Sequence, residues 1–165
     1  MPKVINIVGE KSNVGKTYVI EGIIKELKNR SLSVGTIKHD VHGFDIDKEG
    51  KDTYKHREAG AETVIISSSK RLALIKEINE EVPLEELIKY AKDKDVILVE
   101  GYKKSDLRKI EVFRKGFSKK IISSKDKIIA IASDEELTFE DSLVVKSNDF
   151  IKLVDLILKE ADYKI

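Results

Sequence analysis

A phosphate-binding loop is the most informative chemical feature of the sequence. Residues 9–17 read Gly-Glu-Lys-Ser-Asn-Val-Gly-Lys-Thr and lie between an apolar stretch and a helical pattern. Backbone N–H groups in such a loop, together with the positive end of the next helix, favour phosphate oxygens. Lys16 would reach the β- and γ-phosphates, and the Thr17 hydroxyl would ligate Mg²⁺. The predicted nucleotide contacts are Glu10, Lys11, Ser12, Asn13, Val14, Gly15, Lys16, Thr17 and Tyr18.

The spacing of this loop departs from the usual pattern, in which four residues separate the two glycines. Here five residues separate Gly9 from Gly15, and Glu10 stands where the first glycine is usual. The longer spacing resembles a variant found in dethiobiotin synthetases and their relatives. The alternative is a chance Gly-Lys-Thr at the start of a helix. The strand pattern before the loop and the helix pattern after it favour a P-loop.

Two acidic residues follow other predicted strands. Glu100 ends the apolar run 95–100. In P-loop proteins an acid at this place holds the Mg²⁺ shell or orients water. We therefore predict that Glu100 binds the metal and that Glu100 and Lys16 are catalytic residues. The alternative is an ordinary acid at a strand end. Asp134 follows residues 129–133 and could accept two N–H groups of guanine, although no Asn-Lys-x-Asp motif accompanies it.

A polar loop follows the second predicted strand and holds or adjoins all three histidines, which fall between residues 39 and 56. Its length suggests a functional loop that contacts phosphate, pterin or Mg²⁺-bound water. A transition-metal site built on His39 and His42, or a plain surface loop, are the alternatives. The residues predicted to face a cofactor or to act as a switch are Lys38, His39, Asp40, His42, Asp45, Asp47, Lys51 and Asp52.

Alternating strand and helix patterns place these residues in one fold. The predicted strands are 3–8, 33–38, 95–100, 110–114, 127–132 and 143–146, with a hairpin over 63–67 and 71–78. The predicted helices begin near Lys16, span 51–59, follow Pro83, and begin after a cap at Asn148 or Asp149. We expect a P-loop NTPase-like α/β three-layer sandwich with a mostly parallel sheet and an added β-hairpin, forming a single domain over 1–165.

Composition limits the function classes. The 31 Lys+Arg nearly balance the 30 Asp+Glu, which argues against a dedicated nucleic-acid binder. With 41% hydrophobic and 37% charged residues, no apolar run of membrane-spanning length and no cysteine, we expect a cytoplasmic protein without membrane or thiolate chemistry. Ten Lys/Arg lie between residues 102 and 127 against three acids, forming either a solvated face or a lobe for an anionic ligand.

Four blocks together resemble the MobB family of molybdopterin-guanine dinucleotide biosynthesis adapter proteins. They are the P-loop, the run 35–47, the segment 50–61, and residues 98–102 followed by 109–112. The resemblance implies a homodimer that binds GTP and Mg²⁺ and has weak GTPase activity. It also implies phosphate and Mg²⁺ contacts from Lys16 and Thr17, and a switch-like or cofactor-facing loop over 39–52. The apolar hairpin 63–78 would form the dimer contact.

The family resemblance leaves two functions open. The first is a GTP-dependent adapter, at most a slow GTPase, that assists the guanylyltransferase partner joining GMP to molybdopterin. The second is an ATP- or GTP-dependent small-molecule kinase or synthetase of the dethiobiotin-synthetase type. Rapid turnover of a small acceptor without a partner protein would identify the second.

Overall fold

The computed structural model describes residues 1–164. The chain divides into two compact units, one made of residues 1–39 with the chain from residue 84 onward, the other of residues 40–83. Each unit has its own sheet. That the two together act as a single domain stays a prediction.

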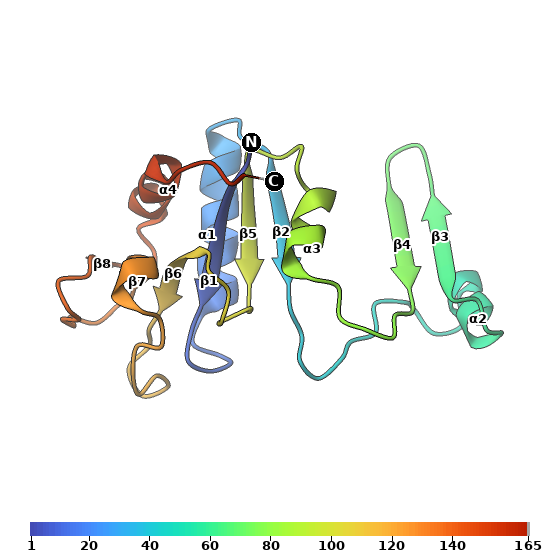
Figure 1. Cartoon of the computed structure of the whole chain (residues 1–165), viewed down its shortest axis with the longest axis horizontal. Helices are drawn as coiled ribbons and strands as arrows, with labels where there is room; N and C mark the ends of the chain where they lie inside the picture. Colours follow the sequence, from blue (N-terminus) through green and yellow to red (C-terminus); the bar gives the residue numbers. More distant parts are fainter. Residues whose placement is uncertain (165) are drawn as a thin grey trace. The chain divides into compact units, whose positions relative to one another are not determined.

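The larger unit is built on a parallel six-stranded sheet with the order β2-β5-β1-β6-β7-β8 (Figure 1). The strands are β1 (Lys3–Val8), β2 (Val34–Lys38), β5 (Val96–Glu100), β6 (Arg108–Val112), β7 (Ile128–Ala132) and β8 (Val144–Val145). Every neighbouring pair in this sheet is parallel. Because the carboxyl ends of parallel strands meet at one edge, the segments that follow β1, β5 and β7 emerge there together. This architecture confirms the predicted fold class.

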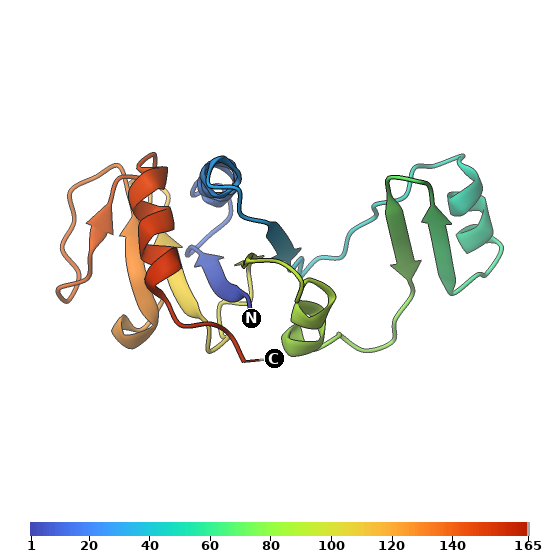
Figure 2. The same cartoon turned by 90° about the horizontal axis from the view of Figure 1, so that it is seen from above.

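Helices cover both faces of this sheet (Figure 2). The helices α1 (Lys16–Asn29) and α4 (Phe150–Lys159) pack on one face, where Ile5, Ile23 and Leu153 are fully enclosed. On the other face α3 (Leu84–Tyr90) packs against Val4 and the apolar side of β5. The apolar run of β5 is therefore buried on both sides, as its sequence predicts. A short 3-10 turn, η1 (Lys125–Lys127), precedes β7.

The observed elements start and end close to the predicted ones, with three corrections. The predicted hairpin strand 71–78 is shorter at both ends and spans Leu72–Lys76. The predicted strand 110–114 begins earlier, at Arg108, and ends at Val112 because the N–H of Arg114 donates to Ser118 Oγ at 3.1 Å instead of continuing the ladder. The predicted strand 143–146 shrinks to two residues. The last helix begins as expected, since the Asp149 side chain accepts the N–H of Lys152 at 3.1 Å.

The connection from β5 to β6 is unusual for parallel strands, because no helix intervenes. These two strands lie on either side of β1, so residues 101–107 must cross over β1. Asn6, buried in the middle of β1, meets that crossing: its Nδ2 donates to the carbonyl of Tyr102 and to Ser105 Oγ, each at 3.0 Å. A polar residue in an otherwise apolar strand thus anchors the loop that follows Glu100.

The smaller unit consists of α2 (Asp52–Glu58) and the antiparallel hairpin of β3 (Thr63–Ser67) and β4 (Leu72–Lys76). The helix predicted over 51–59 is therefore present, one residue shorter at each end. Within residues 1–164, the chain contains no helix of the length and apolarity that crossing a membrane requires.

Candidate nucleotide site

The loop between β1 and α1 has the geometry of an anion cradle. Asn13 and Gly15 adopt positive φ angles of 62° and 102°, and Val14 between them is buried at 2% exposure. The buried valine fixes the loop to the core while the backbone on either side turns outward. The backbone N–H groups of residues 11–16 donate no well-formed hydrogen bond to any described residue. These donors are available to phosphate oxygens, as the sequence predicts.

Gly9 at the start of the loop is required by packing. A Cβ there would lie 2.6 Å from Val14 Cγ2 and 3.1 Å from the backbone oxygen of Val112 at the end of β6. Residue 9 must therefore lack a side chain for Val14 to reach its buried position. The P-loop therefore packs against the end of β6 as well as against α1.

Lys16 bends back over the loop that it follows. Its Nζ donates to the carbonyl oxygen of Lys11 at 3.0 Å. Partial burial lowers the pKa of Lys16, the charge of Glu100 opposes that shift, and Lys103 and Lys38 lower the pKa further. Lys16 therefore lies in a local field set by side chains from β2, β5 and the loop after β5.

Glu100 lies at the carboxyl end of β5, level with Ile7 of β1. Its backbone oxygen accepts the N–H of His39 at 3.0 Å, and its side chain is half-buried. Thr17 is exposed in the first turn of α1, on the next segment along this edge. A hydroxyl and a carboxylate, completed by phosphate oxygens and water, are donors that suit Mg²⁺.

Glu10, the residue in place of a glycine, has a structural partner that its sequence context does not reveal. Its Oε2 accepts the backbone N–H groups of Lys119, through a short bond, and of Lys120 at 3.3 Å. The N–H of Lys119 is the largest cause of a lowered pKa at Glu10. The carboxylate therefore ties the P-loop to the loop that follows β6.

The same loop is held from the sheet by a second carboxylate. Glu111 on β6 is buried at 1% exposure, and its two oxygens accept the N–H groups of Ile122 at 2.8 Å and Ser123 at 2.9 Å. The sequence alone does not predict that Glu111 and Asn6 support the site. The available signal was a charged or amide side chain alternating with apolar residues inside a strand.

Asp134 follows β7 at the same edge of the sheet. Since β6 separates β7 from β1, Asp134 starts roughly 10 Å to the side of the P-loop strand. A hollow of about 580 Å³ lies beside it, lined by residues 133–138, Val144 and Lys146 and by no P-loop residue. This volume is in the range of small-ligand sites. The contact of Asp134 with guanine stays a prediction.

Tyr18 points elsewhere. Its ring lies 5.6 Å from the ring of Phe150 on α4, on the face of the sheet that α1 and α4 cover. The Tyr18 side chain therefore belongs to the packing of α1 on α4, although its backbone adjoins the loop.

The predicted switch or cofactor loop is divided between the two units. Lys38 and His39 belong to the larger unit, where the His39 ring stacks on Tyr102 with centroids 4.5 Å apart. Asp40, His42, Lys51 and Asp52 belong to the smaller unit. There Asp40 Oδ1 accepts the N–H of His42 at 2.9 Å.

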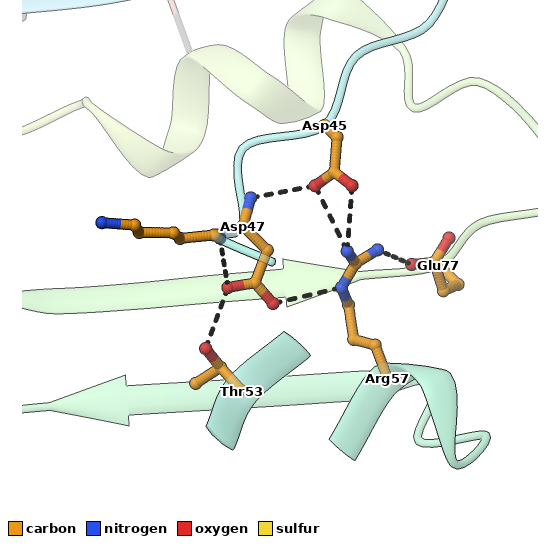
Figure 3. A network of polar contacts seen from close by, with 6 residues as sticks. Asp45, Asp47, Thr53, Arg57 and Glu77 are labelled. Carbon is orange, nitrogen blue, oxygen red and sulfur yellow. Dashed lines mark hydrogen bonds and ion pairs between the residues drawn. The ribbon is translucent and has the colours of Figure 1, made fainter. Parts of the chain in front are cut away.

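Asp45 and Asp47 are engaged inside the smaller unit by Arg57 of α2 (Figure 3). The Arg57 guanidinium contacts Asp45 at 3.2 Å, Asp47 at 3.3 Å and Glu77 at 3.1 Å, while Thr53 Oγ1 donates to Asp47 at 2.9 Å. The N–H of Asp47 and the charge of Arg57 lower the pKa of Asp45. Both carboxylates therefore hold the loop onto α2.

No group of three or more histidine and acidic side chains in the described part of the chain could hold a metal ion. The structure therefore gives no support to a transition-metal site on His39 and His42. The roles of the remaining loop residues toward a cofactor stay predictions.

The basic segment 103–127 is largely engaged within the chain. Arg108 pairs with Glu160 at 2.8 Å and Lys127 with Asp106 at 3.2 Å. The Arg114 guanidinium lies 4.4 Å from the centre of the Phe117 ring. Lys103 is different, because its Nζ donates to the carbonyl oxygen of Glu10 in the P-loop at 2.8 Å. In the sequence, Lys103 is marked only as one cation of this basic segment.

Comparison with known proteins assigns this site to a family. The family described as "Molybdopterin guanine dinucleotide synthesis protein B" (MobB) matches residues 4–134, a range that starts in β1 and ends at Asp134. The chain belongs to the MobB family.

Individual MobB relatives extend this agreement over the chain. It is 36% identical to the molybdopterin-guanine dinucleotide biosynthesis adapter protein of Escherichia coli (strain K12) over 155 residues, 90% of this chain and 87% of the relative. It is 33% identical to the protein of the same name from Haemophilus influenzae over 135 residues, 81% of this chain and 76% of the relative. The crystal structure of Bacillus subtilis MobB superposes with a TM-score of 0.73 at 28% identity, covering 96% of both chains.

Membership of the MobB family confirms the resemblance drawn from the four sequence blocks. The P-loop, Glu100 and Asp134 all fall inside the matched range. The fold of the B. subtilis protein likewise agrees with the predicted fold class.

Proposed function

We propose that this chain is a cytoplasmic GTP-binding adapter of molybdopterin guanine dinucleotide biosynthesis. It would assist the attachment of GMP to molybdopterin by a guanylyltransferase partner, with slow GTP hydrolysis of its own. Membership of the MobB family supports the pathway. The observation that carries the nucleotide role is the P-loop, whose N–H donors are available beside Lys16 and Glu100 on one sheet edge.

Each residue of the site has a task in this proposal. The loop N–H groups and Lys16 would hold the β- and γ-phosphates. Thr17 and Glu100 would hold Mg²⁺, which when bound neutralises phosphate charge. Glu100 would also orient a water of the metal shell, and Asp134 would accept N–H groups of guanine.

A reconstituted reaction tests the adapter role. Guanylyltransferase, molybdopterin and GTP·Mg²⁺ are mixed with and without this chain, and molybdopterin guanine dinucleotide is quantified. The adapter raises the yield at a fixed amount of transferase, and Lys16→Ala removes the increase. An unchanged yield contradicts the role. Rapid multiple turnovers of a small phosphate or carboxylate acceptor without the transferase would instead favour a kinase or synthetase.

We further propose that the chain forms a homodimer through the hairpin of β3 and β4. The antiparallel register sets Ile65 opposite Leu74, with Leu72 on the same face, and these side chains are 59%, 54% and 69% exposed. Val64 on the other face is buried at 7%. A second copy of this hairpin would cover the apolar face and its strand edges.

Analytical ultracentrifugation of two matched variants tests the dimer. Leu74→Glu puts a charge on the exposed apolar face and is expected to give a monomer. Ala73→Glu, the neighbouring residue on the opposite face, is expected to sediment as wild type. A wild-type chain that is monomeric at all concentrations, or a dimer that tolerates Leu74→Glu, contradicts this contact.

A further inference from the structure

A second lysine reaches the P-loop from outside it. Lys103 lies in the segment that follows β5, three residues after Glu100, and its Nζ donates to the carbonyl oxygen of Glu10 at 2.8 Å. Lys16 makes the matching contact from the other end of the loop, to the carbonyl of Lys11 at 3.0 Å. Two ammonium groups thus lie on adjacent carbonyls of the same phosphate-binding loop.

The segment that carries Lys103 is fixed from below by buried polar side chains. Asn6 Nδ2 donates to the carbonyl oxygen of Tyr102 at 3.0 Å. Lys109 Nζ donates to the carbonyl oxygen of Leu107 at 3.0 Å and also to that of Ser105. Both supporting side chains are buried, and they lie on paired positions of β1 and β6. The backbone of residues 102–107 is therefore positioned in advance, and only the exposed Lys103 side chain has to move to meet a ligand.

The backbone on the other side of Lys103 is also constrained. Gly101 and Tyr102 both have positive φ, at 90° and 45°, and the Tyr102 ring stacks on His39. A Cβ at Gly101 would lie 3.0 Å from His39 Cβ, so close packing holds this turn against the end of β2. A non-glycine residue held at positive φ is typical of sites where backbone conformation serves a function.

The charges around Lys16 favour an anionic ligand. Lys103 and Lys38 act on Lys16 from two neighbouring segments, and Glu100 is the acid that opposes them. Glu10 does not neutralise the cluster from its P-loop position, because its carboxylate faces the N–H groups of Lys119 and Lys120. Three cations against one facing carboxylate repel one another until a ligand of several negative charges binds.

We propose that Lys103 is a second phosphate-binding lysine that recognises the terminal phosphate of a nucleoside triphosphate. The inference rests on the proposed nucleotide function. On binding, the ammonium group would leave the Glu10 carbonyl and pair with γ-phosphate oxygens, while Lys16 holds the phosphates next to the loop. Lys103 thereby distinguishes the triphosphate from the diphosphate.

Titration calorimetry with GTP and GDP, each with Mg²⁺, tests this role on full-length variants. Lys103→Met is expected to weaken GTP binding about tenfold while changing GDP binding less than twofold, since a charge-assisted hydrogen bond is lost only with GTP. Lys103→Arg keeps the cation and is expected to retain most of the wild-type difference in affinity between GTP and GDP. Lys104→Met, the next exposed residue, is the matched control and binds both nucleotides as wild type does.

The outcomes separate this inference from the proposed function. Equal weakening of GTP and GDP by Lys103→Met, or no effect on either, overturns the role of Lys103 and leaves nucleotide binding intact. A wild-type chain that binds neither nucleotide overturns both. Thermal unfolding of each variant shows whether the fold is retained, and Lys103→Gln, which also removes the charge, takes the place of Lys103→Met if that variant does not fold.

Discussion

The buried carboxylate of Glu111 offers a sharp test of how the site is supported. Its two oxygens accept N–H groups from Ile122 and Ser123, and no other side chain holds this part of the loop from the sheet side in the described structure. Glu111→Ala leaves two N–H donors without partners, one of them in a buried residue. Glu111→Gln keeps one acceptor but turns an NH₂ group toward the second N–H.

Hydrogen bonds to charged groups contribute about 1.5–3 kcal/mol each, and removing the carboxylate also relieves its desolvation cost. We therefore expect Glu111→Ala to lower the free energy of unfolding by about 4 kcal/mol and Glu111→Gln by about 2 kcal/mol. For a chain of 165 residues, about 4 kcal/mol corresponds to a Tm decrease of roughly 8–16 °C. The loop also touches Glu10, so GTP affinity should fall in parallel.

Urea unfolding and amide hydrogen exchange measure the two consequences separately. Exchange at Ile122 and Ser123 should accelerate strongly in both variants, before global unfolding. Glu21→Gln, an exposed acid on α1, is the control and should change stability by less than about 0.5 kcal/mol. Glu111→Gln with wild-type stability and wild-type exchange at both amides would refute the reasoning.

Two further predictions concern packing and pH. A Cβ at Gly22 would lie 2.1–2.4 Å from the Phe150 ring, so Gly22→Ala should lower the free energy of unfolding of wild type by about 1–2 kcal/mol. In a Phe150→Ala background the same substitution should raise the free energy of unfolding, because alanine favours a helix more than glycine does. Chemical denaturation of the four proteins would contradict this if Gly22→Ala had the same sign of effect in both backgrounds. Hydrogen bonds from Ser33 lower the pKa of Asp95 below 3.8, so its contribution is complete above that pH and disappears as pH falls through the folded-state pKa. The stability advantage of wild type over Asp95→Asn, followed by urea midpoints from pH 7 to pH 2, should shrink only below about pH 4; an advantage independent of pH would show that the carboxylate charge is irrelevant.

The order of elements could be predicted from the sequence because each has a distinct local period. The unbroken apolar run before Glu100 predicts a strand buried on both faces, and β5 is one. The apolar residues at helical spacing after Gly15 likewise predict α1. The P-loop conformation followed from the same local information, since Gly15 and the helix start are neighbours in the chain.

Contacts across long sequence separations could not be predicted in this way. Glu10 departs from the glycine pattern because it binds a loop 109 residues further along the chain. Asn6 is a polar residue in an apolar strand because the β5–β6 crossing passes over it. Tyr18 adjoins the P-loop in sequence, but its ring packs on α4. In each case the partner is far away in the chain, and no local pattern encodes such a contact.

The most direct test of the central claim is a calorimetric titration of the wild-type chain with GTP·Mg²⁺, repeated in excess ATP and with Lys16→Ala. We predict specific GTP binding that ATP does not displace, weakened roughly ten- to a hundredfold by the substitution, because Lys16 loses a charge-assisted contact with phosphate. Equal affinity for GTP and ATP would contradict guanine selection at Asp134. Wild-type affinity in Lys16→Ala would contradict the P-loop as the nucleotide site.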